Sequence, residues 1–203
     1  YKVCAVTAEG NGEYSANVAI VRNPFVDDLA TTDSCFTAVM WAYSKGIVKG
    51  TSATTFSPSS NCKRVDFTIM LWRMAGTPAA SGENPFTDLD GLTKNQKAAI
   101  SWAYNAGIIK GTGDGTTFSP NDMLTRYQIV LMLYRMAGKP NVTLPDESPF
   151  EDIDSSKTFY KAAVWALNSG ITKANPFRAT DNCTRGELTI FLRRLDRLMN
   201  GTE

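Results

Sequence analysis

The stretch PFTDLDGLTKNQKAAISWAYNAGIIKG, residues 85–111, decides the fold, because related copies of it begin at Pro24 and Pro149. Each copy has Pro-Phe-x-Asp, then a segment carrying Trp-Ala, then Gly-Ile-x-Lys. The copies begin about 60 residues apart, and further landmarks recur downstream of each. Self-similarity at a fixed period of this length indicates that each copy is one structural unit. The sequence therefore predicts three tandem modules.

Each module predicts two helices. In the first helix Ala and Trp recur with the spacing of one buried face, and a Gly follows where a helix end with positive φ favours it. We expect these tryptophans, Trp41, Trp102 and Trp165, to belong to the core. The second helix begins at Thr125-Arg126-Tyr127-Gln128 or Thr184-Arg185-Gly186-Glu187, which are capping-box patterns; the first module has the weaker start Lys63-Arg64-Val65-Asp66.

The first 22 residues have a different pattern. Apolar and polar residues alternate on both sides of Glu9–Gly12, which predicts a β-hairpin with its turn there. A lone hairpin is marginally stable, so we expect a remnant of a larger upstream domain. These residues resemble the last two strands of a fibronectin type III or similar sandwich domain. The predicted organisation is a hairpin at 1–22 and repeats at 23–80, 81–144 and 145–203.

Composition excludes several classes of function. The 203 residues are 43% hydrophobic, enough for one compact core shared by the modules. The 21 basic and 20 acidic residues are evenly spread, so binding to nucleic acid or an anionic membrane is disfavoured. No apolar run approaches the roughly 20 residues that span a bilayer. The chain contains no His, the commonest general base and metal ligand, and we expect neither metal nor cofactor.

Four cysteines are present, Cys4, Cys35, Cys62 and Cys183, without the C-x-x-C spacing of zinc or redox sites. Cys62 and Cys183 occupy the repeat position where the second module has Leu124, which favours a small buried hydrophobic residue. A Cys35–Cys62 disulfide is the alternative, because the second module lacks both cysteines.

An arginine at the first position of each second helix is the leading candidate for chemistry: Arg64, Arg126 and Arg185. A cation is disfavoured at this end of a helix, where the dipole and free N–H groups are already positive. The arrangement is favourable if open amides and a guanidinium together receive a carboxylate or phosphate. The alternative is a structural ion pair with Asp27, Asp88 and Asp152, residues that otherwise read as N-caps or Asx-turns.

Other side chains are candidates for contacts to the same ligand. Lys49 and Lys110 follow the Gly-Ile-x turn and can add a second cationic donor. Trp72 and Tyr134 occupy equivalent positions on the second helices, where the third module has Arg193. A position that tolerates Arg is expected to be partly exposed, and an exposed aromatic ring can stack on a sugar.

Taken together, Phe-x-Asp, Trp-Ala, Gly-Ile-Val-Lys-Gly, Thr-Thr-Phe-Ser-Pro and Thr-Arg-x-Glu resemble the S-layer homology (SLH) module over about residues 24–198. The resemblance implies a mainly α fold: three helical hairpins in a pseudo-threefold arrangement around a central three-helix bundle, with grooves between modules. It also implies non-covalent anchoring to a secondary cell-wall polysaccharide, often pyruvylated, on the bacterial surface.

The resemblance carries the family's binding arginine over to Arg64, Arg126 and Arg185, and its groove glycine to Gly50 and Gly111. The second module keeps Thr, Arg, Gly and Lys, so we expect Arg126 to belong to the best-preserved site. The third departs at Ala174 and Phe177-Arg178-Ala179, which puts its groove in doubt.

We therefore expect a non-catalytic glycan-binding anchor, a monomeric module of a larger extracellular protein. The alternative is a structural or protein-interaction module with vestigial grooves. A two-carboxylate hydrolase is disfavoured, because no pair of Asp or Glu recurs outside turns and caps.

Overall fold

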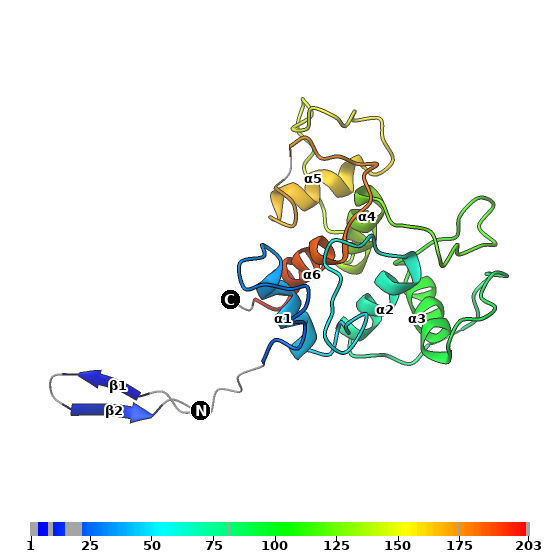
Figure 1. Cartoon of the computed structure of the whole chain (residues 1–203). Helices are drawn as coiled ribbons and strands as arrows, with labels where there is room; N and C mark the ends of the chain where they lie inside the picture. Colours follow the sequence, from blue (N-terminus) through cyan, green and yellow to red (C-terminus); the bar gives the residue numbers. More distant parts are fainter. Residues whose placement is uncertain (1–3, 8–9, 15–21, 81, 174, 202–203) are drawn as a thin grey trace.

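The computed structural model describes residues 4–7, 10–14, 22–80, 82–173 and 175–201. Within these ranges the chain forms six α-helices and one pair of short strands (Figure 1). The helices are α1 (Phe36–Ser44), α2 (Arg64–Met74), α3 (Lys94–Asn105), α4 (Arg126–Met136), α5 (Tyr160–Asn168) and α6 (Arg185–Asn200). The mainly helical fold is confirmed, with two helices from each repeat.

The ends of the helices follow the expected local chemistry. Glycines with φ of 70°, 69° and 73° follow α1, α3 and α5, as the sequence predicts: Gly46, Gly107 and Gly170. At the start of α6, Thr184 and Glu187 form the predicted capping box. At the start of α4, the N–H of Thr125 donates to Gln128 Oε1 at 3.0 Å, while the Thr125 hydroxyl is buried without a partner.

Strands β1 (Cys4–Thr7) and β2 (Gly10–Tyr14) pair antiparallel near the N-terminus, away from the helices (Figure 1). Val6 pairs with Asn11 and Thr7 with Gly10. The expected turn at Glu9–Gly12 is corrected, because residues 10–12 belong to β2. Glycine accepts extended backbone as readily as turn conformations, so the Gly-Asn-Gly sequence does not fix the turn. Residues 1–3, 8–9 and 15–21 of the predicted 1–22 hairpin lie outside the described residues.

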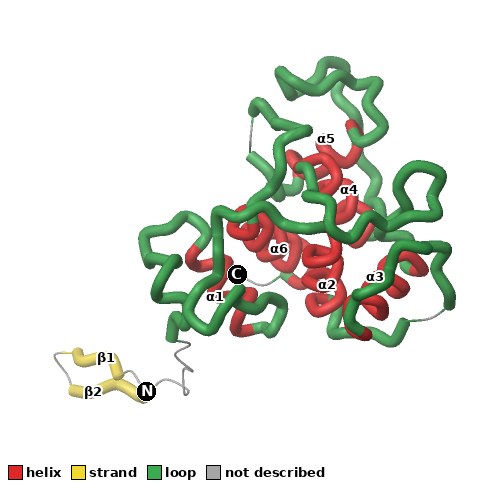
Figure 2. The backbone as a smooth tube through the Cα atoms, turned by 45° about the vertical axis from the view of Figure 1, so that its right-hand side comes forward, coloured by secondary structure: helices red, strands yellow, loops and turns green. Residues whose placement is uncertain are grey.

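The helices pack between repeats. Helix α3 packs against α2, α5 against α4, and α1 against α6 (Figures 1 and 2). The first helix of one repeat therefore lies on the second helix of the preceding repeat, and α1 closes the cycle on α6. The expectation of a helical hairpin within each repeat is corrected. Periodicity identifies an apolar face on every helix but not which copy supplies its partner.

Backbone hydrogen bonds join the three repeats in the same cyclic order. The N–H of Cys62 donates to Cys183 O at 3.1 Å, that of Cys183 to Leu124 O at 3.0 Å, and that of Leu124 to Cys62 O at 3.1 Å. These residues immediately precede the N-caps of the three second helices. The bonds fix the starts of α2, α4 and α6 beside one another, so the three repeats share one centre (Figure 2).

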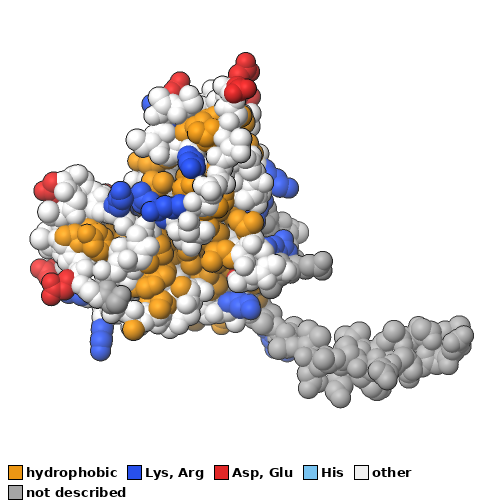
Figure 3. Space-filling view, turned by 180° about the vertical axis from the view of Figure 1, so that it is seen from behind, with side chains coloured by type: hydrophobic (Ala, Val, Ile, Leu, Met, Phe, Trp, Pro, Cys, Tyr) orange, Lys and Arg blue, Asp and Glu red, His pale blue; other side chains and the backbone are white. Residues whose placement is uncertain are grey.

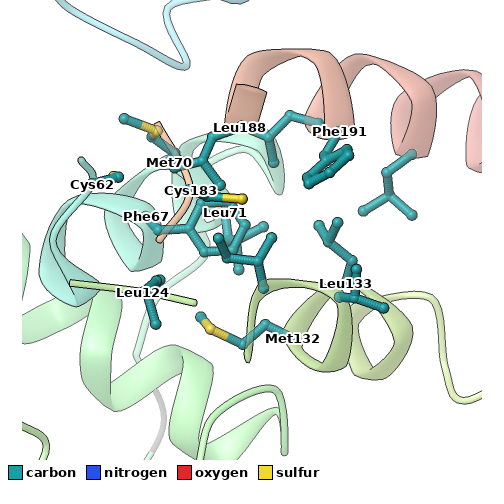
Figure 4. Packing of buried hydrophobic residues seen from close by; sticks show 14 of the residues in the cluster. Cys62, Phe67, Met70, Leu71, Leu124, Met132, Leu133, Cys183, Leu188 and Phe191 are labelled. Carbon is teal, nitrogen blue, oxygen red and sulfur yellow. The ribbon is translucent and has the colours of Figure 1, made fainter. Parts of the chain in front are cut away.

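The hydrophobic core is continuous through this centre. Figure 4 shows side chains of all three repeats meeting there, with Phe67 and Leu71 from α2, Leu133 from α4, and Leu188 and Phe191 from α6. These five side chains are at most 4% exposed. Trp165 is buried, and Trp41 and Trp102 pack half-buried against the same core, as predicted. No single repeat encloses this core, so the repeats depend on one another for burial.

The cysteines behave as buried hydrophobic residues. Cys62 and Cys183 are 1% and 0% exposed and lie in the shared core (Figure 4), which confirms the first interpretation. Cys35 is also buried, and all three are free thiols, so the alternative of a Cys35–Cys62 disulfide is wrong. Burial raises the pKa of Cys62 and of Cys183 to about 12. Both remain protonated at neutral pH.

The surface carries no large region of one charge on the face seen in Figure 3. Hydrophobic side chains occupy its centre, Lys and Arg lie between them, and Asp and Glu lie towards the rims. Among the described helices none is long and apolar enough to cross a bilayer. The described residues also include no cluster of three His, Cys, Asp or Glu side chains suited to a metal ion.

Candidate functional site

Helices α2, α4 and α6 begin at Arg64, Arg126 and Arg185, so the predicted position of each arginine is confirmed. The backbone amides there are occupied, however. They donate to carbonyl oxygens of a neighbouring repeat: Arg64 N to Asp122 O at 2.8 Å, Arg126 N to Asp181 O at 3.0 Å, and Arg185 N to Ser60 O at 2.8 Å. The amide that follows each arginine is used in the same way. The expectation of open N–H donors is wrong, because contacts between repeats satisfy them.

The arginine side chains reach across the same boundaries. Arg185 Nε donates to Phe56 O at 3.0 Å and its Nη2 to Lys49 O at 2.9 Å. Arg64 Nη2 donates to Lys110 O at 2.6 Å. Each guanidinium therefore holds the Gly-Ile-x-Lys loop of the repeat against which it packs. The structure combines Lys110 with Arg64, not with the Arg126 of its own repeat.

The first open cleft, cleft 1, lies between repeats one and three and extends to the start of α3. Its lining includes Lys49, Gly50, Asp66, Arg73 and Arg185, and its volume is about 390 Å³. Three cationic side chains and one carboxylate thus border a single cavity. Arg185 is half-buried, lines the cleft and takes part in none of the described ion pairs, although two of its nitrogens donate to carbonyls.

The second open cleft, cleft 2, lies between repeats one and two and has a volume of about 380 Å³. Its lining includes Arg64, Lys110, Gly111, Tyr127 and Arg135. The cavity is therefore equivalent to cleft 1, with an aromatic ring added. Both volumes lie within the range of small-molecule binding sites.

Arg64 is the most unusual group in cleft 2. Its side chain is 8% exposed, and its Nε has no hydrogen-bond partner. Burial lowers the pKa of its guanidinium, and the charge of Asp122 offsets this only in part. A buried cation with an unsatisfied donor gains more from an added anion than a solvated cation does.

At the equivalent position between repeats two and three, the arginine is occupied by the protein's own groups. Arg126 is 4% exposed, and its Nη1 lies 3.5 Å from Glu187 Oε1. Its Nε donates to Phe177 O at 2.8 Å and its Nη2 to Thr172 Oγ1 at 3.4 Å. Its guanidinium also lies over two aromatic rings. The structure thus places Arg126, the arginine expected to serve the best-preserved site, against the protein's own groups.

The Asp residues that recur after the Phe of each repeat support the loops that form the cleft walls. Asp88 accepts hydrogen bonds from the amides of Phe118 and Ser119 at 2.8 and 2.7 Å, and Asp152 makes the equivalent bonds in repeat three. In repeat one the residue is Asp28, which bonds Phe56 N and Ser57 N, while Asp27 is exposed. These carboxylates therefore bond to amides of a distant loop instead of acting as the N-caps or Asx-turns that the sequence predicted. Among the described ion pairs none joins them to the helix-start arginines.

This assignment has a structural reason. Ser57, Ser119 and Arg178 have φ near +60°, a conformation that non-glycine residues rarely adopt. A carboxylate bonded to two successive amides stabilises that turn, and the carbonyl of the preceding Phe then faces the arginine. Repeat one has one more residue between its Phe and this carboxylate than the other two repeats, so Asp28 supports the turn there in place of Asp27.

Both groove glycines lie where a side chain does not fit. A Cβ on Gly50 would lie 2.7 Å from the Phe25 ring and against the carbonyl of Ser52. A Cβ on Gly111 would overlap the backbone of Gly115. Close approach of loop backbone therefore requires glycine at both positions.

Trp72 and Tyr134 lie outside the linings of both clefts. Trp72 Nε1 donates to Pro78 O at 2.8 Å, and the Tyr134 hydroxyl to Pro140 O at 3.0 Å. Tyr134 is 8% exposed and packs on Trp165, with ring centroids 5.5 Å apart. The expectation of an exposed aromatic ring is therefore wrong for Tyr134, because its ring is buried. Both aromatic side chains instead hydrogen-bond to the linker that follows their helix.

The sequence alone gives no role to the arginine that lies nine residues further along each second helix. Arg73, Arg135 and Arg194 donate to the carbonyls of Ile47, Ile108 and Ile171 at 3.2, 3.2 and 2.8 Å. Arg73 and Arg135 also line clefts 1 and 2. Their exact recurrence in every repeat was the signal that could have identified them.

The S-layer homology domain matches residues 27–68, 85–129 and 149–189, and the chain belongs to this family. It is 36% identical over 144 residues to an endoglucanase of Bacillus sp. (strain KSM-635), covering 70% of this chain and 15% of that protein. It is 26% identical over 173 residues to an S-layer protein of Bacillus thuringiensis subsp. finitimus, covering 82% of this chain and 20% of that protein.

A similar match joins the chain to the S-layer protein sap of Bacillus anthracis, with 26% identity over 172 residues, 82% of this chain and 20% of that protein. The chain spans a fifth or less of the length of these three relatives. The relatives thus include two S-layer proteins and an endoglucanase.

Proposed function

We propose that this domain is a non-catalytic anchor that holds a larger surface protein on a bacterial cell wall by binding an anionic secondary polysaccharide. Membership of the SLH family supports anchoring, and the names of the relatives support a location at the cell surface. A pyruvate ketal on the polysaccharide would supply the anion. The observation that carries the proposal is the buried guanidinium of Arg64, which lines an open cleft and has no ion-pair partner among the described residues.

Binding is expected to depend on side chains, because the helix-start amides are used between repeats. In cleft 2 the ligand carboxylate would accept from Arg64 and Lys110, while Tyr127 would contact a sugar face. In cleft 1 Arg185 and Lys49 would supply the equivalent donors. Once one cleft has bound a repeating polymer, the second cleft meets the next unit at a high effective concentration, so two weak clefts would together bind the polymer more tightly than either alone.

The finer organisation is part of the same proposal. We infer a pseudo-threefold arrangement with α2, α4 and α6 as the central helices, supported by the cyclic hydrogen bonds at Cys62, Leu124 and Cys183. The repeats would occupy residues 23–80, 81–144 and 145–203, ranges that contain the three family matches. Residues 1–22 would be the remnant of an upstream β-domain, and the module would act as a monomer.

The second candidate is a structural or protein-interaction module with vestigial grooves. The pairing of Arg126 with Glu187 favours it for the third position alone. The proposal is that clefts 1 and 2 keep the binding function.

The test is a pulldown of this chain on purified cell wall with and without its pyruvylated polymer. Arg64→Ala and Arg185→Ala are each expected to reduce binding, and the double variant to reduce it further. Arg197→Ala changes an exposed arginine on α6 and serves as the control. Equal binding to stripped wall, or full binding by the double variant with an unchanged melting temperature, would support the second candidate.

A further inference from the structure

At each of the three boundaries between repeats, the third residue of the second helix lies close to the arginine of the neighbouring repeat, and its charge differs from one boundary to the next. The third residue of α2, α4 and α6 is Asp66, Gln128 and Glu187, respectively. Asp66 lines cleft 1 and Gln128 lines cleft 2. Glu187 lies at the boundary where Arg126 is closed off. An acid, an amide and a longer acid thus occupy equivalent places beside the arginine of the neighbouring repeat.

Glu187 makes the contacts that a bound carboxylate would make. Its Oε1 lies 3.5 Å from Arg126 Nη1 and 3.6 Å from Arg178 Nη2. Its Oε2 accepts a hydrogen bond from the N–H of Thr184 at 2.9 Å. Two guanidinium groups from different elements therefore converge on one oxygen of an internal carboxylate.

The other two boundaries lack this arrangement. Gln128 is neutral, so cleft 2 contains no carboxylate opposite Arg64 at this position. Asp66 is charged but one methylene shorter than glutamate, and within the described residues no ion pair joins it to Arg185. Arg64 retains an unpaired Nε, whereas Arg126 has a partner for every nitrogen.

We propose that this helix position determines which boundary accepts an anionic sugar, with Glu187 acting as a built-in substitute for the ligand carboxylate. The inference rests on the proposed function of clefts 1 and 2. Cleft 2, with Gln128, is the strongest anion site. Cleft 1 is weaker because Asp66 repels the ligand, and the third boundary is occupied from within.

The charge at this position can be changed without losing the helix cap. Gln128 Oε1 accepts from Thr125 N at 3.0 Å, and Gln96 Oε1 accepts from Thr93 N at 2.9 Å. Glutamine therefore already performs the capping role twice in this chain. Glu187→Gln is expected to keep the start of α6 while removing the internal carboxylate.

The experiment is calorimetric titration of the whole chain with a pyruvate-ketal disaccharide, comparing wild type, Glu187→Gln and Gln128→Glu. Wild type is expected to bind two molecules. Glu187→Gln is expected to bind a third, because Arg126 and Arg178 lose the internal carboxylate that balances their charge. Gln128→Glu places a carboxylate beside Arg64 and is expected to weaken the tightest site by about tenfold or more.

The two variants act in opposite directions, so a general loss of stability cannot imitate the result. If Glu187→Gln fails to fold, Gln128→Glu still decides between the outcomes. Unchanged stoichiometry in Glu187→Gln and unchanged affinity in Gln128→Glu, with normal binding by wild type, would overturn this inference alone. Failure of wild type to bind at millimolar ligand would instead overturn the proposed function, and this inference with it.

Discussion

Two adjacent carboxylates in repeat one are predicted to have very different effects on stability. Asp28 accepts hydrogen bonds from Phe56 N at 2.7 Å and Ser57 N at 2.6 Å, whereas Asp27 is exposed and its side chain makes no described hydrogen bond. Alignment of the Pro-Phe-x-Asp motif points to Asp27. The structure points to Asp28, so Asp28→Ala and Asp27→Ala form a matched pair.

The magnitude follows from the two amides that Asp28→Ala leaves without their acceptor. Hydrogen bonds to a charged group contribute about 1.5–3 kcal/mol each, and water can replace part of this because Asp28 is half-buried. The expected loss is about 3 kcal/mol. In a domain of this size about 1 kcal/mol corresponds to 2–4 °C, so the melting temperature should fall by about 6–12 °C.

Thermal unfolding followed by circular dichroism measures this difference directly. Asp27→Ala should leave the melting temperature within about 2 °C of wild type, as surface substitutions usually do. Equal effects of the two variants, or a larger effect of Asp27→Ala, would refute the assignment of the loop-supporting role to Asp28. Binding at cleft 1 should weaken with Asp28→Ala, because the same loop presents Phe56 O to Arg185.

Three further predictions concern other parts of the molecule. Gly111→Val should abolish binding at cleft 2 and lower the melting temperature, measured by titration and thermal unfolding, because its side chain overlaps the backbone of Gly115. Because the pKa of Cys62 and of Cys183 is raised in the folded protein, only the unfolded chain ionises these thiols between about pH 9 and 12. Their contribution to the free energy of unfolding is therefore complete below about pH 8 and is lost as the pH rises through that window. Urea unfolding at a series of pH values would measure this loss, with Cys62→Ala as the comparison. A chain ending at residue 144 lacks α6, the packing partner of α1, and hydrogen exchange in α1 should then become fast.

The sequence allowed the local elements to be predicted well. Fixed periodicity located the six helices, and capping patterns placed Arg64, Arg126 and Arg185 at the helix starts. Burial of Cys62 and Cys183 followed from their equivalence to Leu124. These features depend on residues close together in the chain, for which local propensity and spacing are sufficient.

Contacts between repeats could not be predicted in the same way. Three similar modules present similar faces, so their sequences do not determine that α1 packs on α6 or that Arg64 combines with Lys110. The helix-start amides donate to backbone carbonyls of loop residues in a neighbouring repeat. Because every residue has a carbonyl, no residue type in the sequence indicates this contact. The closing role of Glu187 is also hidden, because a glutamate at this position has a sufficient explanation as a helix cap.

The closure of α1 on α6 has a consequence for how the domain bears tension. Covalent chain joins repeat one to two and two to three, but repeats three and one meet only through non-covalent packing and hydrogen bonds. A pull transmitted through residue 22 reaches α1 first and acts on that seam. The mechanical strength of the attachment would therefore be set by the α1–α6 contact. Cleft 1, which spans repeats one and three, would open with that seam, whereas cleft 2 between repeats one and two would stay intact.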